Sequence, residues 1–323
     1  MKIIQIDNLY RASEMFDKAM PKTQWLIDER IPYGSLSALV GESGVGKSTF
    51  LRQLAIAIAS GKNSFLNFKL NPKFKKVLYI STEDGYTFTH AALMKQLHMT
   101  PDRFDDKGIL KEKDDCLNNI FFLFDHEQIT DKLRHILKEE DFDLIIVDAY
   151  SDIFLGDMNQ SNQVRTFLSH YTKLASEYGI AILFMHHFGK GMKSNDKHKI
   201  LGSAGFEQKM RSVLSLSRKD NQIHLQTIKN NYLSQAECQM AFHLEMGDDL
   251  TFTVVDSFHR DESRSGGSNT KVYTLLNEYT NYIKNLKSGH LNFEIIRNRL
   301  EEEHNFKVSV GTLHKAVKLY QEE

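Results

Sequence analysis

Residues 35–49 read SLSALVGESGVGKST, and this stretch decides the fold of the 323-residue chain. Its first part, Ser35–Val40, is rich in apolar residues and predicts a buried β-strand. The residues GESGVGKS match the pattern G-x-x-x-x-G-K-[ST] in full, and Ser48–Ser60 carries apolar residues at helical spacing. A strand, a glycine-rich turn and a helix in this order are the context that a phosphate-binding loop requires.

The chemistry of such a loop follows from its glycines and its lysine. Glycines let backbone N–H groups turn inward around phosphate oxygens, and the helix N-terminus adds a favourable dipole. Lys47 can reach the β- and γ-phosphates, and the Ser48 hydroxyl can ligate Mg²⁺. The alternative is a glycine-rich turn that binds nothing. We expect ATP and Mg²⁺ as cofactors, and a nucleotide-binding set of Gly41, Glu42, Ser43, Gly44, Val45, Gly46, Lys47, Ser48 and Thr49.

Strand-length apolar runs alternate with helical patterns along the middle of the chain, which is typical of βαβ units and a largely parallel sheet. The later strands are expected at Lys76–Ser81, Asn119–Phe124, Leu144–Ala149 and Ile180–His186. Helices are expected around Thr87–Leu97, Gln128–Glu140 and Gln160–Tyr178. After Arg211 the runs become short and alternating, at 212–217, 222–229, 239–246 and 250–256. The fold class is therefore α/β, with a mostly parallel central sheet and an antiparallel extension.

The chain divides by composition into three parts. Residues 1–256 form the expected α/β domain, with a short lead-in at 1–33. Residues 257–270 are polar and contain Ser265-Gly266-Gly267-Ser268, which predicts a flexible linker. Residues 271–323 show three helical patterns, and Ser309 is placed to cap the last one, Val310–Gln321. Thr312, His314, Lys315 and Lys318 on that helix suit a winged-helix-like DNA-binding domain, but a helical appendage that docks a protein partner fits equally well.

The overall composition indicates a globular protein. Apolar residues make up 41% of the chain and charged residues 26%, which excludes disordered and collagen-like classes. The formal net charge is −1, so any attraction to nucleic acid must come from local patches. The two cysteines are too few for a disulfide framework, and no apolar run is long enough to cross a membrane. We therefore expect a cytoplasmic protein with buried thiols and no membrane partner.

Two further strand ends carry carboxylates. Leu144-Ile145-Ile146-Val147 runs directly into Asp148, which places this carboxylate where it can hold Mg²⁺ beside the phosphates. The sequence Ser81-Thr82-Glu83-Asp84-Gly85 ends another strand, and Glu83 is the predicted group that orients the attacking water. Asp84 could serve instead, or both carboxylates could belong to a capping turn.

The order of these motifs resembles the RepA-type branch of the RecA-like ATPases, known from plasmid hexameric helicases. The likeness covers roughly residues 20–256 and includes the lead-in Trp25–Gly34. Beyond the loop it rests on Tyr79–Asp84, Val147–Tyr150, Met185-His186-His187 and Gly202-Ser203-Ala204. It implies a homo-oligomeric ring, expected to be a hexamer, with the nucleotide between subunits. Glu83 would match the catalytic glutamate and His187 a polar sensor near the γ-phosphate.

The two histidines should behave differently because side chains alternate along a strand. One of them should face the nucleotide and the other should pack in the interior. Zinc binding is the alternative, but no further ligand follows at the required spacing.

The resemblance also implies an arginine finger from a neighbouring subunit. Arg211 is the leading candidate, and Arg218 is the rival. Lys229 resembles another element of the family. Each of these cations could instead be solvated or paired within its own chain.

The segment 188–199 is polar, contains glycines and is locally basic. In such a ring it would face the central channel, where Lys190, Lys193, Lys197 and Lys199 could bind single-stranded DNA through its phosphates. A solvated loop over the nucleotide is the alternative.

These features together predict an ATP hydrolase and DNA helicase or translocase that acts on single-stranded nucleic acid for a mobile element. The competing prediction is a nucleotide-switched oligomeric DNA-binding or loader protein that does not unwind processively.

Overall fold

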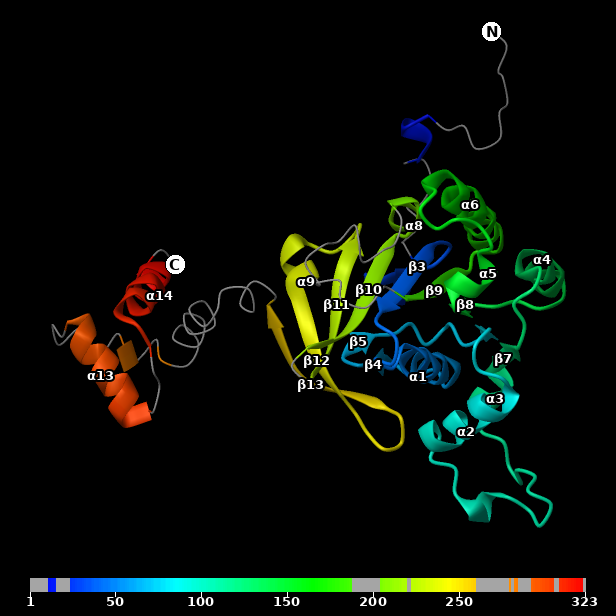
Figure 1. Ribbon diagram of the computed structural model, residues 1–323, viewed down its shortest axis with the longest axis horizontal. Helices are drawn as coiled ribbons and strands as arrows, with labels where there is room; N and C mark the ends of the chain where they lie inside the picture. Colours follow the sequence, from blue (N-terminus) through cyan, green and yellow to red (C-terminus); the bar gives the residue numbers. More distant parts are fainter. Residues whose placement is uncertain are drawn as a thin grey trace, which may run out of the picture.

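A nine-stranded sheet forms the centre of the protein (Figure 1). The computed structural model describes residues 11–15, 24–187, 204–219, 222–259, 279, 282–283, 292–304 and 308–321. The strand order is β13-β12-β11-β10-β3-β9-β8-β6-β7. In chain order the strands are β3 Leu36–Gly41, β6 Val77–Ser81, β7 Ile120–Leu123, β8 Leu144–Asp148, β9 Ala181–His187, β10 Ser212–Lys219, β11 Gln222–Asn230, β12 Met240–Met246 and β13 Phe252–His259.

The sheet is parallel from β10 through β3 to β7 and antiparallel from β10 to β13. The predicted fold class is therefore confirmed, and the five central strands begin and end within one residue of their predicted limits. The register brings the carboxyl ends of the parallel strands together: Gly41 pairs with His187, and Ser81 pairs with Asp148. In open parallel sheets, functional side chains gather at the edge formed by the carboxyl ends of the strands.

Helices cover both faces of the central strands, which explains why those strands are apolar throughout. On one face, α1 (Lys47–Ala59) buries Leu51, Leu54 and Ile58 against the sheet. On the other face, α4 (Ile129–Glu139) and α6 (Ser161–Tyr178) form a second core. Every residue of β8 is buried as a result, including the aspartate at its end.

Short elements complete the domain. Two-residue and three-residue strands form the hairpins β1 (Trp25–Ile27) with β2 (Ile31–Pro32), and β4 (Ser64–Phe65) with β5 (Phe68–Lys69). Among the described residues, the other helices of the domain are α2 Tyr86–Gln96, α3 Asp115–Asn119, α5 Tyr150–Ile153, α8 Ala204–Lys209 and α9 Gln235–Gln239, with 3-10 turns at Ser13–Met15 and Pro101–Arg103.

Helix α1 is joined to the last strand by a glutamine side chain. The Gln53 amide donates to the carbonyl of Phe252 (2.9 Å) and accepts from its N–H (2.8 Å), as a neighbouring strand residue would. The amide of Gln96 on α2 donates to the carbonyls of Thr49 (2.9 Å) and Leu250 (2.8 Å). The β12–β13 hairpin is thus fixed to the helix that follows the glycine-rich loop.

The last part of the chain has its own hydrophobic cluster. Strand β13 continues to His259, so the predicted boundary after residue 256 falls inside a paired strand. Residues 260–270 of the predicted linker lie outside the described residues, as does most of the first predicted C-terminal helix. Helices α13 (Phe293–His304) and α14 (Val310–Gln321) pack around Ile296, Leu300 and Leu313, among others.

Ser309 caps α14 as predicted, because its hydroxyl accepts from the Thr312 N–H at 3.1 Å. Thr312 is buried and therefore cannot present its side chain to DNA, whereas His314 is exposed. Cys116 is buried as predicted, but Cys238 is only half-buried, since it lies in the short exposed helix α9. Among the described helices, none is long and apolar enough to cross a membrane.

Candidate nucleotide site

The glycine-rich loop takes its shape from backbone conformations that favour glycine. Gly44 and Gly46 have φ angles of +78° and +96°, in the left-handed region. Gly41 has no room for a side chain, because a Cβ there would lie 2.2 Å from the carbonyl oxygen of Leu216 on β10. Helix α1 begins at Lys47, directly after Gly46, so its free N–H groups face the loop.

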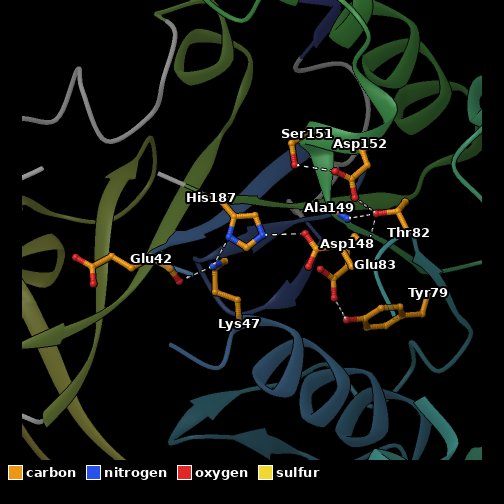
Figure 2. Close-up of polar contacts among 10 residues, drawn as sticks. All are labelled: Glu42, Lys47, Tyr79, Thr82, Glu83, Asp148, Ala149, Ser151, Asp152 and His187. Atoms are coloured by element: carbon orange, nitrogen blue, oxygen red, sulfur yellow. Dashed lines mark hydrogen bonds and ion pairs between the residues drawn. The ribbon is translucent and has the colours of Figure 1, made fainter. Parts of the chain in front are cut away.

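Lys47 is buried at the centre of the site (Figure 2). Its Nζ atom donates to the carbonyl oxygen of Glu42 at 2.7 Å and lies 2.9 Å from Nδ1 of His187. Burial lowers the pKa of Lys47 to about 8, although the carboxylates of Asp148, Glu83 and Glu42 oppose this change. The ammonium group is held by the Glu42 carbonyl and the His187 ring nitrogen. An incoming phosphate, which is charged, can replace these two partners.

His187 connects this lysine to Glu83. A protonated lysine has no lone pair, so Nδ1 of the histidine must accept, and the ring proton then lies on Nε2. Nε2 is 3.2 Å from Oε1 of Glu83 and can donate to it. Lys47, His187 and Glu83 thus form one chain of polar contacts from the loop to the carboxylate predicted to orient water (Figure 2).

Asp84 has a different partner from its neighbour Glu83. Its carboxylate forms an ion pair of 3.0 Å with Arg52, a residue of α1 whose side chain is only 7% exposed. Because Asp84 is engaged in this pair and Glu83 is linked to the loop lysine through His187, the geometry favours Glu83 over Asp84 as the group that acts on water.

Asp148 is buried at the end of β8. Its Oδ2 atom accepts a hydrogen bond from the Tyr79 hydroxyl at 2.5 Å, whereas Oδ1 is buried and has no hydrogen-bond partner among the described residues. Burial raises the pKa of this carboxyl, while the Tyr79 and Ser48 hydroxyls act to lower it. A carboxylate oxygen without a partner beside a serine hydroxyl is the kind of donor pair that Mg²⁺ takes, so these residues fit the ion.

Thr82 joins the two strand ends and was not predicted from the sequence. Its hydroxyl accepts from the N–H of Ala149 (2.8 Å) and lies 2.5 Å from Oδ2 of Asp152, while its N–H donates to the Asp148 carbonyl (2.8 Å). These bonds fix Glu83, the next residue, relative to Asp148. The signal was a threonine directly before the carboxylates, but its partners lie at the end of β8 and in the residues that follow it.

The other histidine packs in the interior, as strand alternation predicts. The His186 ring contacts the rings of Tyr150 and Phe206, with centroids 5.5 Å and 5.0 Å apart. Burial lowers its pKa to about 4, so it is neutral at physiological pH. In the part of the chain that the structure describes, no three His, Cys, Asp or Glu residues lie together as a possible metal site.

The candidate arginine fingers lie at opposite edges of the sheet. The N–H of Arg211 bonds the carbonyl of Leu36 at the start of β3, so its exposed side chain is five residues, about 17 Å, from the loop edge. Arg218 is exposed two residues beyond Leu216, which pairs with Gly41, and thus lies at the loop edge. Lys229 donates to the carbonyl of Glu207. The basic segment with Lys190, Lys193, Lys197 and Lys199 lies outside the described residues.

A glycine-rich loop between strand and helix, with a buried aspartate and a glutamate at neighbouring strand ends, defines a P-loop ATPase of the RecA-like class. Residues 8–193, more than half of the chain, match the model of a family described as AAA domain, and the protein belongs to this family.

Two curated relatives are DNA repair proteins named RadA. The protein of Halalkalibacterium halodurans is 24% identical over 265 residues, which cover 80% of this chain and 50% of the relative. The protein of Bacillus subtilis is 25% identical over 241 residues, which cover 73% of this chain and 44% of the relative. The chain thus spans about half the length of the curated relatives it matches.

Proposed function

We propose that this protein is a Mg²⁺-dependent ATPase that assembles as a hexameric ring and moves along or unwinds single-stranded DNA, as a RepA-like replicative helicase of a mobile element. The observation that carries the proposal is the chain of contacts Lys47, His187 and Glu83 at one edge of the sheet, with exposed Arg211 at the opposite edge. One subunit binds the phosphates and activates the water, and the neighbouring subunit supplies the Arg211 guanidinium.

Each residue of the site has a distinct role in this proposal. The loop N–H groups and Lys47 bind the phosphates, and Glu83 accepts a proton from the attacking water. Ser48 and Asp148 hold Mg²⁺, which neutralises phosphate charge when it is bound. His187 keeps Glu83 oriented and registers whether Lys47 is engaged with a phosphate.

The transferred phosphoryl group gathers negative charge that a cation must offset. Arg52 lies on α1 near the site, but it is already paired with Asp84. Arg211 cannot reach the loop of its own subunit, which supports delivery to a neighbour placed head to tail. Heterologous contacts of this kind close into rings or continue as filaments.

Single-stranded DNA is the proposed substrate because the segment 188–199 follows directly on β9 and carries four lysines. The names of the two relatives, DNA repair protein RadA, support a DNA partner. The C-terminal helices are proposed to bind DNA or a protein partner.

The first test measures ATP hydrolysis with and without single-stranded DNA, together with the mass in solution in the presence of a non-hydrolysable ATP analogue. We expect DNA to stimulate turnover and the analogue to give the mass of a ring. Charge-neutral variants of the four lysines should lose the stimulation. If the protein still forms a ring but its rate of ATP hydrolysis is unchanged by DNA, the proposed helicase or translocase function is wrong.

The shared site has its own test, in which two inactive variants are mixed. Lys47→Ala subunits retain Arg211, and Arg211→Ala subunits retain the loop lysine. If the arginine acts across the interface, the mixture should recover part of the activity that each variant lacks alone. No recovery would exclude Arg211, and the same mixture with Arg218→Ala then tests the rival.

A second candidate function is a DNA repair ATPase or loader that uses ATP to set its oligomeric state without processive unwinding. The names of the relatives favour it. A strand-separation assay distinguishes the two: the helicase requires ATP-dependent release of one strand, and the loader does not.

A further inference from the structure

Tyr79 touches the candidate metal-binding carboxylate from inside the domain. Its side chain is 1% exposed on β6, and its hydroxyl donates to Oδ2 of Asp148 at 2.5 Å (Figure 2). The same hydroxyl is 3.5 Å from the carbonyl oxygen of Ser48, at the limit of a hydrogen bond. Tyr79 therefore contacts both residues that would hold Mg²⁺.

This contact makes the two oxygens of Asp148 unequal. Oδ2 is occupied by the tyrosine hydroxyl, and Oδ1 is buried without a partner among the described residues. A buried carboxylate oxygen without a partner carries a free-energy cost, so the arrangement persists only because the surroundings impose it. The hydrogen bond from Tyr79 fixes the rotation of the Asp148 carboxylate about its Cβ–Cγ bond. Oδ1 is thereby left free to bind a ligand.

The tyrosine ring is itself fixed in place. It belongs to the core beneath α1 and packs against Phe122 on β7, with ring centroids 5.4 Å apart. Tyr79 and Ile146 are directly paired across β6 and β8, and Ser81 and Asp148 are paired further along. The hydroxyl therefore cannot move away from Asp148 without repacking of the core.

We propose that Tyr79 is a positioning residue that orients the Asp148 carboxylate so that Oδ1 receives the hydrated Mg²⁺ that accompanies ATP. The inference rests on the proposed ATPase function. Groups that hydrogen-bond to metal-binding carboxylates orient them, and their loss commonly lowers metal affinity or activity by roughly 10- to 100-fold. Tyr79 is buried in the core, so it acts through the residues that would hold Mg²⁺, and its short hydrogen bond is to Asp148.

Tyr150, the first residue of α5, provides a matched control two residues after the end of β8. It is also 1% exposed, but its hydroxyl has no hydrogen-bond partner among the described residues. Tyr79→Phe and Tyr150→Phe each remove one buried hydroxyl and keep the ring. Only the first removes a bond to Asp148.

The experiment measures Mn²⁺ binding by electron paramagnetic resonance in the presence of a non-hydrolysable ATP analogue. We expect Tyr79→Phe to raise the Mn²⁺ dissociation constant by about tenfold or more. Tyr150→Phe should leave it within about twofold of the wild type. Analogue binding in EDTA should be unchanged in Tyr79→Phe, because the loop and Lys47 are intact.

The outcomes separate the inference from the proposed function. Wild-type Mn²⁺ affinity in folded Tyr79→Phe would overturn the positioning role alone, and so would equal losses in both tyrosine variants. Absence of metal-dependent nucleotide binding in the wild type would overturn the ATPase function and the inference with it. If Tyr79→Phe does not fold, Phe122→Leu loosens the ring but keeps the hydroxyl. It should weaken Mn²⁺ binding, and unchanged affinity would again overturn the role.

Discussion

The Nζ atom of Lys47 lies 2.9 Å from Nδ1 of His187, on the strand next to the loop. This distance ties the group that binds phosphate to a histidine that also contacts Glu83. A phosphate that draws the lysine away changes the hydrogen bonding of the histidine. In the proposed function, this change at His187 is how the state of the nucleotide would reach the Glu83 carboxylate.

Replacement of His187 tests this relationship. His187→Ala should lower turnover by about 10- to 100-fold, because Glu83 loses the donor that orients it. Nucleotide affinity should change less, since the loop and Lys47 remain. Steady-state kinetics and binding of a fluorescent ATP analogue measure the two effects. His90→Ala, at an exposed position on α2, is the control, and equal losses of affinity and turnover would contradict the role.

The neighbouring carboxylates Glu83 and Asp84 should give opposite results. Glu83→Gln should reduce hydrolysis by about 100-fold or more and leave stability nearly unchanged. Asp84→Asn leaves the buried Arg52 guanidinium without its ion partner and should lower the free energy of unfolding by about 1–3 kcal/mol. Turnover assays and urea unfolding of both variants check this. Loss of hydrolysis in a stable Asp84→Asn protein would reverse the assignment.

Two glycines with similar backbones allow a matched comparison of the loop. Gly44 and Gly108 have φ angles of +78° and +75°, and a Cβ at either would meet no atom within 4 Å. Each change to alanine should therefore cost about 1 kcal/mol of stability. Only Gly44→Ala should weaken ATP binding, because its methyl group enters the loop that surrounds the phosphates. Isothermal titration calorimetry measures the ATP dissociation constant of both variants. Equal affinities of the two variants for ATP would contradict the prediction.

The Thr82 hydroxyl can be removed with little change in shape. Thr82→Val leaves the N–H of Ala149 without its acceptor and should cost about 1–3 kcal/mol in unfolding free energy. Turnover should fall as well, because Glu83 is no longer fixed relative to Asp148. Thr82→Ser keeps the hydroxyl and should restore both properties. A valine variant with normal turnover would show that the backbone alone positions Glu83.

Stability should depend on pH through His186. Burial lowers its pKa to about 4 in the folded protein, below the value of about 6.5 expected when unfolded. The unfolded chain therefore binds a proton first as the pH falls, and stability is lost between pH 6.5 and 4, by up to roughly 3 kcal/mol. Denaturant unfolding of His186→Met across this range should show a flatter profile. The exposed His135→Gln variant should behave as the wild type.

The sequence was sufficient to predict the central sheet because β3, β6, β8 and β9 are buried along nearly their whole length and the edge strand β7 is apolar throughout. Their apolar runs are continuous, so the limits of β3, β6, β7, β8 and β9 differ from the predictions by at most one residue. The hairpins β1–β2 and β4–β5 were not predicted, since strands of two or three residues are too short to show a period.

Site residues that belong to a local sequence motif could be predicted. Site residues whose role depends on a contact with another element could not. The loop and Asp148 follow from local patterns. Glu83 was predicted from the sequence, but Asp84 stayed open as an alternative, because what distinguishes them is an ion pair between Asp84 and Arg52 on another element. Tyr79 and Thr82 were missed for the same reason, as their partners lie on β8 and in the residues that follow it.

The two hydrogen bonds between Gln53 and the backbone of Phe252 make α1 and β13 a single mechanical unit. A helix tied to a strand in this way cannot tilt without carrying that strand along. Strand β13 ends at His259 and is the last described strand before the C-terminal helices α13 and α14 in the sequence. Any movement of α1 against the phosphates is therefore also a movement of β13, the strand that precedes the C-terminal helices in the sequence.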